Sequence, residues 1–148
     1  MKQDKATRDL ALARFAGERI AHLATAATDG RPHIVPFCFV VVGDAVYSVI
    51  DDKPKRTHTG LRRLRNIEAN PRVSVLVDHY EEDWKALWFV MVEGEAGVVT
   101  DSQEYRRARV AMRAKYPQYL TMELTEAVNP MIRIRIERVV TWQGSGVS

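Results

Sequence analysis

Two turn signals divide residues 21–50 into three apolar runs, and they constrain the fold more than any other feature of the chain. Asp29-Gly30 separates the first run from a second over residues 33–42, and Gly43-Asp44 separates the second from a third, residues 45–50. Asp-Gly between apolar runs is a strong sign of a β-hairpin, because glycine readily adopts the positive φ that tight hairpin turns require. The sequence therefore predicts an antiparallel meander of three strands.

The remaining chain adds three predicted strands and several helical segments. In residues 130–142 the isoleucines at 132, 134 and 136 alternate with charged residues, the period of two expected for a half-buried strand. Further strands are predicted at 72–77 and 84–92, and helices at 1–18, near residue 60 and within an insertion at 101–126. Because helices and strands do not alternate regularly, we expect a mainly β fold, a closed six-stranded antiparallel barrel with flanking helices, rather than a parallel α/β sheet.

The composition indicates one ordinary globular domain. With 148 residues, 46% of them hydrophobic, the chain can bury a core but is short for two domains, so we expect a single domain over residues 1–148. No apolar run approaches the roughly 20 residues that cross a bilayer, and the N-terminus lacks the apolar centre of a secretory signal. We therefore expect a cytoplasmic protein with no membrane partner. The single cysteine, Cys38, excludes a disulfide framework.

A basic segment between two predicted strands is the strongest functional feature. Residues 51–72 contain seven lysine and arginine residues around a predicted turn and short helix. A helix start offers free N–H groups and the positive end of the helix dipole, which together with mobile cations favour a phosphate or carboxylate. A solvated basic loop is the alternative, because charge runs usually form solvated faces. We expect no nucleic acid as partner, because no aromatic side chains interleave with these cations.

The side chains that carry chemistry form no recognisable catalytic motif. The sequence has no nucleophile elbow, phosphate loop or dinucleotide-binding glycine motif, and its four histidines lack the spacing of metal ligands, so we predict no metal site. This pattern fits an enzyme whose cofactor performs the chemistry, because a flavin-like ring needs only positioning and electrostatics from the protein. Tyr80, Trp84 and Trp88 are candidates for a wall beside such a ring, and a core role is the alternative for each tryptophan.

The strand predicted over residues 33–42 is apolar on both faces. A barrel strand normally turns one face to solvent, so the second apolar face needs a cover, either from a helix or from another subunit. We therefore expect the protein to dimerise.

Three segments within residues 18–98 carry a family resemblance: LATAATDGRPHIVPFCFVV, VYSVIDDKPKRT and LRRLRNIEANPRVSVLVDHYEEDWKALWFVMVEGEA. Together they resemble the pyridoxamine 5′-phosphate oxidase-like split-barrel superfamily. Within it, the chain is most similar to the deazaflavin-dependent oxidoreductases that use coenzyme F-420. The resemblance implies a homodimer of six-stranded split barrels of the FMN-binding type, with two cofactor sites at the subunit interface.

The resemblance also implies which residues contact the cofactor. The implied set is His33, Ile34, Val35 and Pro36 beside the ring, Ser48, Lys55, Arg56 and Thr57 at the ribityl chain and phosphate, Arg62, Arg63 and Asn66 on the phosphate-side helix, and Trp84 and Trp88 from the partner subunit. Family members often have Lys-Thr-Arg-Asn where this chain has Arg63-Leu64-Arg65-Asn66. Whether Lys55 or Arg63 is the principal phosphate cation therefore stays open.

The function implied is an oxidoreductase in which reduced coenzyme F-420 transfers hydride to a small unsaturated or quinone-like substrate. The surplus of basic residues favours F-420, whose phosphate and polyglutamate tail are both anionic, over FMN. An FMN-dependent oxidase or reductase on the same fold is the alternative, and a non-enzymatic binder of a flavin, deazaflavin or haem is another. The proton would come from water or from a nearby group such as His33 or Tyr80, the two catalytic candidates.

Overall fold

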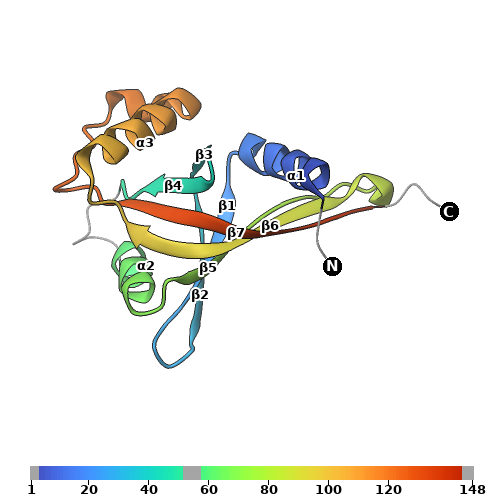
Figure 1. The fold of residues 1–148 in the computed structure, drawn as a ribbon, viewed down its shortest axis with the longest axis horizontal. Helices are drawn as coiled ribbons and strands as arrows, with labels where there is room; N and C mark the ends of the chain where they lie inside the picture. Colours follow the sequence, from blue (N-terminus) through green and yellow to red (C-terminus); the bar gives the residue numbers. More distant parts are fainter. Residues whose placement is uncertain (1–3, 52–57, 145–148) are drawn as a thin grey trace.

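The computed structural model describes residues 4–51 and 58–144, which form seven strands, three α-helices and two short 3-10 helices (Figure 1). The helices are α1 (Lys5–Gly17), α2 (His58–Ala69), η1 (Trp84–Ala86), α3 (Ser102–Lys115) and η2 (Pro117–Thr121). The strands are β1 (Ala21–Ala26), β2 (Pro32–Phe37), β3 (Val40–Val42), β4 (Ala45–Val49), β5 (Arg72–His79), β6 (Trp88–Val98) and β7 (Met131–Gln143).

All seven strands belong to one antiparallel sheet in the order β2-β1-β5-β6-β7-β4-β3. This order puts β2 and β3 at opposite edges, although only Cys38 and Phe39 separate them in the chain. The sheet must therefore curl until its two edges approach each other around these residues, which makes a split barrel. The expectation of a mainly β split barrel with flanking helices is confirmed.

The strand count differs from the expected six because the run over residues 33–42 is interrupted. The backbone of Phe39 makes its hydrogen bonds with a side chain instead of a neighbouring strand: its N–H donates to Tyr116 Oη at 3.0 Å, and its carbonyl oxygen lies 2.9 Å from the same hydroxyl. The Phe39 ring is fully buried, 4.9 Å from the ring of Phe15. The predicted meander is therefore two hairpins, β1–β2 and β3–β4, at opposite ends of the sheet.

Two prolines explain why β2 lies at an edge. Pro32 and Pro36 pair with Ala26 and His22 of β1, and neither proline has an N–H to offer a second neighbour. The same two residues discourage another chain from adding a strand at this edge.

Two clusters of buried side chains hold the elements together. The larger fills the barrel with residues of β1, β5, β6 and β7, and α1 contributes Phe15 while α2 contributes Ile67. The smaller packs α3 against β4 through Tyr105, Ala108 and Met112. The helical insertion expected over residues 101–126 is helical in part. Its regular helix, α3, ends at Lys115, and the short 3-10 helix η2 begins at Pro117.

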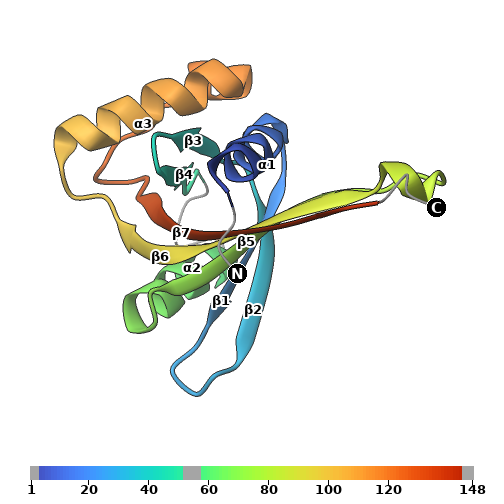
Figure 2. The same ribbon diagram turned by 45° about the vertical axis from the view of Figure 1, so that its right-hand side comes forward.

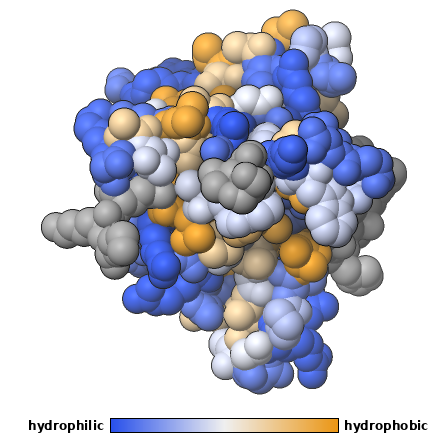
Figure 3. Space-filling view, turned by 90° about the vertical axis from the view of Figure 1, so that its right-hand side faces the viewer, coloured by the Kyte–Doolittle hydropathy of each residue, from blue (hydrophilic) through white to orange (hydrophobic). Residues whose placement is uncertain are grey.

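Strands β5, β6 and β7 extend beyond the barrel as a long arm that ends at η1 (Figure 2). The strand expected to start at Trp84 starts at Trp88, because Asp83 caps η1 by accepting a hydrogen bond from Lys85 N–H at 3.2 Å. Seen from the end of the arm, apolar residues form separate patches among hydrophilic ones (Figure 3). Within the described ranges, no helix is long and apolar enough to cross a membrane.

Candidate functional site

A cavity of about 230 Å³ lies where the two edges of the sheet approach each other, and we call it the split cavity. It is lined by Ile20, Pro36, Phe37, Cys38, Ser48, Val49, Ile50, Asp51, Arg63 and Tyr119. Three of these residues, Pro36, Ser48 and Arg63, were implied as cofactor contacts by the family resemblance. They come from β2, β4 and α2, so the fold gathers them from three separate segments.

The floor of the split cavity is held by a side-chain hydrogen bond. Ser48 is 2% exposed, and its hydroxyl donates to the carbonyl oxygen of Cys38 at 2.7 Å. This bond ties β4 to the crossing between β2 and β3. The hydroxyl keeps its lone pairs, so Ser48 can still accept a hydrogen bond from a bound group.

The four implied ring contacts on β2 do not share one face. Val35 is buried in the barrel core, whereas Ile34 is 64% exposed on the opposite face. His33 is half-buried on the same side as Val35, and its Nδ1 is buried with no hydrogen-bond partner among the described residues. Of the four, Pro36 is the residue that lines the split cavity.

Helix α2 brings its arginines close to β2. Burial lowers the pKa of His33, and the positive charges of Arg62 and Arg63 lower it further. The imidazole is therefore neutral at neutral pH, and both arginines lie near it. Asn66, implied as a cofactor contact, is buried and donates to Thr25 Oγ1 at 3.0 Å, so it anchors α2 to β1.

The remaining implied contacts lie elsewhere. Lys55, Arg56 and Thr57 fall outside the described residues. Trp88 lines a separate cavity of about 350 Å³ on the arm, where it stacks with His79, and Trp84 is 67% exposed in η1. Tyr80 lines that arm cavity too, so neither this tyrosine nor the tryptophans reach the split cavity of their own chain.

Two residues of the cavity wall had no signal in the sequence. Tyr119 of η2 donates its phenolic hydrogen to Asp51 Oδ2 at 2.8 Å. Burial raises the pKa of Tyr119, and the neighbouring carboxylate raises it further, so the phenol stays protonated. The two residues are 68 positions apart, and only the docking of η2 against the end of β4 joins them.

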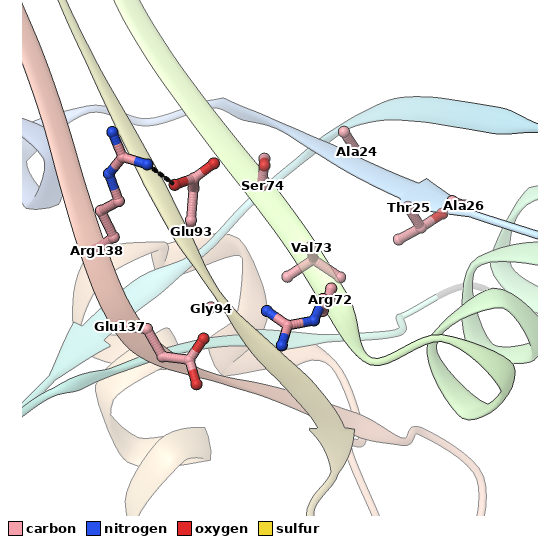
Figure 4. Close-up of a pocket in the computed structure, with 10 residues that line it drawn as sticks. All are labelled: Ala24, Thr25, Ala26, Arg72, Val73, Ser74, Glu93, Gly94, Glu137 and Arg138. Atoms are coloured by element: carbon pink, nitrogen blue, oxygen red, sulfur yellow. Dashed lines mark ion pairs between the residues drawn. The ribbon is translucent and has the colours of Figure 1, made fainter. Parts of the chain in front are cut away.

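A second concavity, of about 500 Å³, lies on the outer face of the sheet (Figure 4). Glu93 and Arg138 reach toward each other across β6 and β7 as an ion pair at 3.5 Å, and Arg72 and Glu137 line the same groove. None of the implied cofactor contacts in the described part of the chain lines it. No cluster of three or more histidine, cysteine or acidic side chains within the described ranges could hold a metal ion.

Solved structures share this fold. The chain is similar to the conserved hypothetical protein Rv2991 from Mycobacterium tuberculosis, with 22% identity, a TM-score of 0.71, and coverage of 97% of this chain and 87% of that one. An FAD-binding protein from Mesorhizobium loti has 22% identity, a TM-score of 0.67 and coverage of 94% of both chains. HutZ, the heme storage protein from Vibrio cholerae, has 18% identity and a TM-score of 0.65, and the match covers 97% of this chain and 95% of that one. At these identities the likeness establishes the fold alone.

The family assignment comes from the sequence comparisons. No curated protein gives a significant match to the chain. Residues 8–143 match the family model described as pyridoxamine 5′-phosphate oxidase, and because the match spans nearly the whole chain, the protein belongs to that family.

Proposed function

We propose that the protein is an oxidoreductase that uses reduced coenzyme F-420 to transfer hydride to a small unsaturated or quinone-like substrate. The observation that carries the proposal is the convergence of Pro36, Ser48 and Arg63, three implied cofactor contacts, on the split cavity. An oxidoreductase with FMN in the same place is the second candidate, and the fold shared with an FAD-binding protein favours a flavin there.

The charges around the split cavity support an anionic cofactor. Arg63 lines the cavity, and Arg62 lies with it near His33 on the α2 side. Arginine binds phosphate through several N–H groups at once, so this side suits the phosphate end. The basic residues in 51–72 exceed the need of one phosphate, which favours F-420 with its additional carboxylates over FMN.

When bound, the deazaflavin or flavin ring supplies the hydride, and the chain supplies position and a dry surface. Pro36 and Phe37 offer an apolar wall, and Ser48 offers a hydrogen-bonding group at the floor. His33 is a poor proton donor near neutral pH because its pKa is lowered. Tyr80 lies on the arm, so water is the proton source in this proposal.

The size of the split cavity supports a site shared between two subunits. Its 230 Å³ is smaller than the roughly 300–1,000 Å³ typical of small-molecule pockets, so one chain would hold only part of a three-ring cofactor. We propose a homodimer in which the partner completes the site, with Trp84 and Trp88 as candidates to close it. A non-enzymatic haem or flavin binder is the remaining alternative, but none of the described histidines lines the split cavity.

The test is a calorimetric and fluorescence titration of cofactor-free protein with coenzyme F-420 and with FMN at two salt concentrations. We expect F-420 to bind more tightly and with the steeper salt dependence, because salt screens the contacts made by exposed cations. Arg63→Gln should weaken F-420 binding about tenfold or more, the effect of losing about 1.4 kcal/mol. Arg65→Gln is the matched control, since Arg65 is exposed on the same helix and does not line the cavity.

Each outcome of the titrations assigns the protein to one of the candidate functions. Tighter binding of FMN than of F-420 moves the protein to the flavin alternative, and haem binding without electron transfer to any acceptor supports the non-enzymatic one. Equal effects of Arg63→Gln and Arg65→Gln would contradict the placement of the phosphate beside Arg63.

A further inference from the structure

A larger cavity adjoins the split cavity on the side of η2, and we call it the η2 cavity. Its volume is about 490 Å³, within the range of small-molecule sites. It shares Ile20, Cys38, Asp51 and Tyr119 with the split cavity, so molecules in the two cavities would meet at this common wall. Nothing in the cofactor proposal uses the rest of the η2 cavity.

One wall of the η2 cavity is aromatic and rigid. The rings of Tyr116 and Tyr119 meet edge to face with centroids 5.8 Å apart, and both residues are less than 10% exposed. The Tyr116 hydroxyl lies 2.8 Å from the carbonyl oxygen of Arg19 and also binds the backbone of Phe39. Both phenolic groups are therefore fixed by partners, which leaves a preorganised wall on which a planar ring can pack.

Apolar side chains border the same cavity. Ile20 is 48% exposed and Met122 is 41% exposed, and both line the cavity together with Pro117. A flexible methionine adapts to ligand shape and packs well against aromatic rings. A ring that enters the cavity would remove part of this apolar surface from water, which favours binding.

Two opposite charges are positioned along the aromatic wall. The guanidinium of Arg19 lies 5.6 Å from the ring centroid of Tyr116, while the carboxylate of Asp51 accepts the hydrogen of Tyr119. No ion pair joins Arg19 to Asp51 in the described part of the chain. Arg19 uses one Nη to donate to the carbonyl oxygen of Lys115, and its other N–H groups can still donate. The ammonium of Lys115 adds positive charge near Arg19.

We propose that the η2 cavity is a second small-molecule site, which takes a planar aromatic carboxylate with a hydrogen-bond donor on its far side. The ring packs on Tyr116, Tyr119 and Met122, the carboxylate binds Arg19, and the donor binds the carboxylate of Asp51. The order of the charges sets the orientation, because Asp51 repels a carboxylate placed at its end. The inference goes beyond the proposed function, since Arg19, Tyr116 and Met122 line the η2 cavity and not the split cavity, whichever cofactor the split cavity takes.

The test uses three fluorescent naphthalene probes and cofactor-free protein. 6-Hydroxy-2-naphthoate has both groups, 2-naphthoate lacks the donor and 2-naphthol lacks the carboxylate. We expect 6-hydroxy-2-naphthoate to bind with a dissociation constant of about 1 mM or tighter, as a ligand of this size allows, and each incomplete probe to bind about tenfold more weakly. Wild-type protein that binds the three probes equally, or binds none, overturns the proposal.

Substitutions at the cavity wall test whether the probe binds in the η2 cavity. Met122→Trp should fill the space and weaken 6-hydroxy-2-naphthoate binding about tenfold, whereas Leu120→Trp should leave it unchanged, because Leu120 is 65% exposed on η2 and does not line the cavity. Arg19→Gln should weaken the two carboxylates and spare 2-naphthol. Equal effects of Met122→Trp and Leu120→Trp would overturn the assignment. F-420 and FMN titrations of the same variants separate this site from the cofactor proposal, since either can fail while the other holds.

Discussion

At the scale of single residues, Lys115 holds its charge in an unfavourable environment. Its ammonium lies 3.8 Å from the ring centroid of Phe39, and its Nζ is buried with no hydrogen-bond acceptor among the described residues. Burial, followed by repulsion from Arg19, lowers the pKa of Lys115 from 10.5 to about 8. The contact with the Phe39 ring offsets part of this cost because an aromatic face attracts a cation.

We expect Lys115→Met to stabilise the protein at pH 7 and to do so less at pH 9.5. Between pH 8 and 10.5 the unfolded chain keeps a proton on this amine that the folded chain has lost, so wild-type stability rises with pH across this window. The stability of Lys115→Met does not rise in this way, so its advantage over the wild type is smaller at pH 9.5. A Tm increase of about 2–4 °C at pH 7, the shift for about 1 kcal/mol in a chain of this length, is the expected size by calorimetry.

Lys85→Met is the control for this variant, because Lys85 is an exposed residue of η1 and should change Tm little at either pH. If Lys115→Met lowers Tm by the same amount at both pH values, then the charge of Lys115 does not set its effect on stability, and the wild-type side chain contributes through packing instead.

The family resemblance named Pro36, Ser48 and Arg63 as cofactor contacts, and the fold brings these three residues to one cavity; their contact with a cofactor stays a prediction. The sequence could not distinguish Asn66 as an anchor of α2, since that role depends on Thr25, 41 residues away. Tyr119 and Asp51 were missed for the same reason. Side chains whose partners are distant in sequence have no local signature, whereas charge runs and turn residues do.

At the scale of elements, a charged bridge fixes α3 to the sheet. Glu104 of α3 accepts from Tyr47 Oη of β4 at 2.6 Å and from Arg133 of β7 at 2.8 Å. The hydrogen bond from Tyr47, helped by Arg133, lowers the pKa of Glu104 against the opposing effect of burial. Burial and the carboxylate raise the pKa of Tyr47 to about 12. The bridge therefore favours a charged Glu104 and a neutral Tyr47.

We expect Glu104→Gln to lower the free energy of unfolding at pH 7 by about 1–3 kcal/mol, the cost of disrupting a partly buried, hydrogen-bonded charge. Because the folded pKa lies below the unfolded value of 4.5, the stabilisation is present above that pH and is lost as pH falls through the folded pKa. Urea unfolding at pH 7 and pH 3.5 should show a smaller difference from wild type at pH 3.5. In the Glu104→Gln variant, hydrogen exchange should show that α3 opens more often than β6.

The exposed Glu123 supplies the control, and Glu123→Gln should change neither unfolding nor exchange. A cost of Glu104→Gln that does not shrink at pH 3.5 would mean that the bridge contributes through packing rather than charge.

The prediction of strands succeeded where the sequence itself shows the pattern of the strand, and it failed where a contact with a distant element interrupts the strand. The alternation over residues 130–142 predicted β7 closely, since a half-buried strand needs a period of two. The apolar run over 33–42 gave no sign of its break, because Phe39 is as apolar as its neighbours. The break depends on Tyr116, which is 77 residues away.

At the scale of the whole molecule, the outer face of the sheet is the surface that we propose for the homodimer contact. The pairing register places Pro36, His22, Leu76, Met91 and Val140 in one row across five strands, and none of them is fully buried. Four of the five are apolar. The next row contains Ile34, Glu93 and Arg138, and Figure 4 shows its charges of both signs. A surface with both signs can match its own copy across a two-fold axis.

We expect the wild-type protein to sediment as a dimer and Ile34→Lys to raise the dimer dissociation constant about tenfold or more. Ile34 is 64% exposed on the outer face, so the lysine should be tolerated in the monomer while it opposes burial between subunits. Leu10→Lys is the matched control, because Leu10 is 61% exposed on α1 and lies outside this face. Sedimentation equilibrium measures both. The prolines of β2 discourage the edge from pairing with a second copy, so a dimer that resists Ile34→Lys would use a different surface. The proposal that a partner completes the split cavity across the outer face would then be wrong.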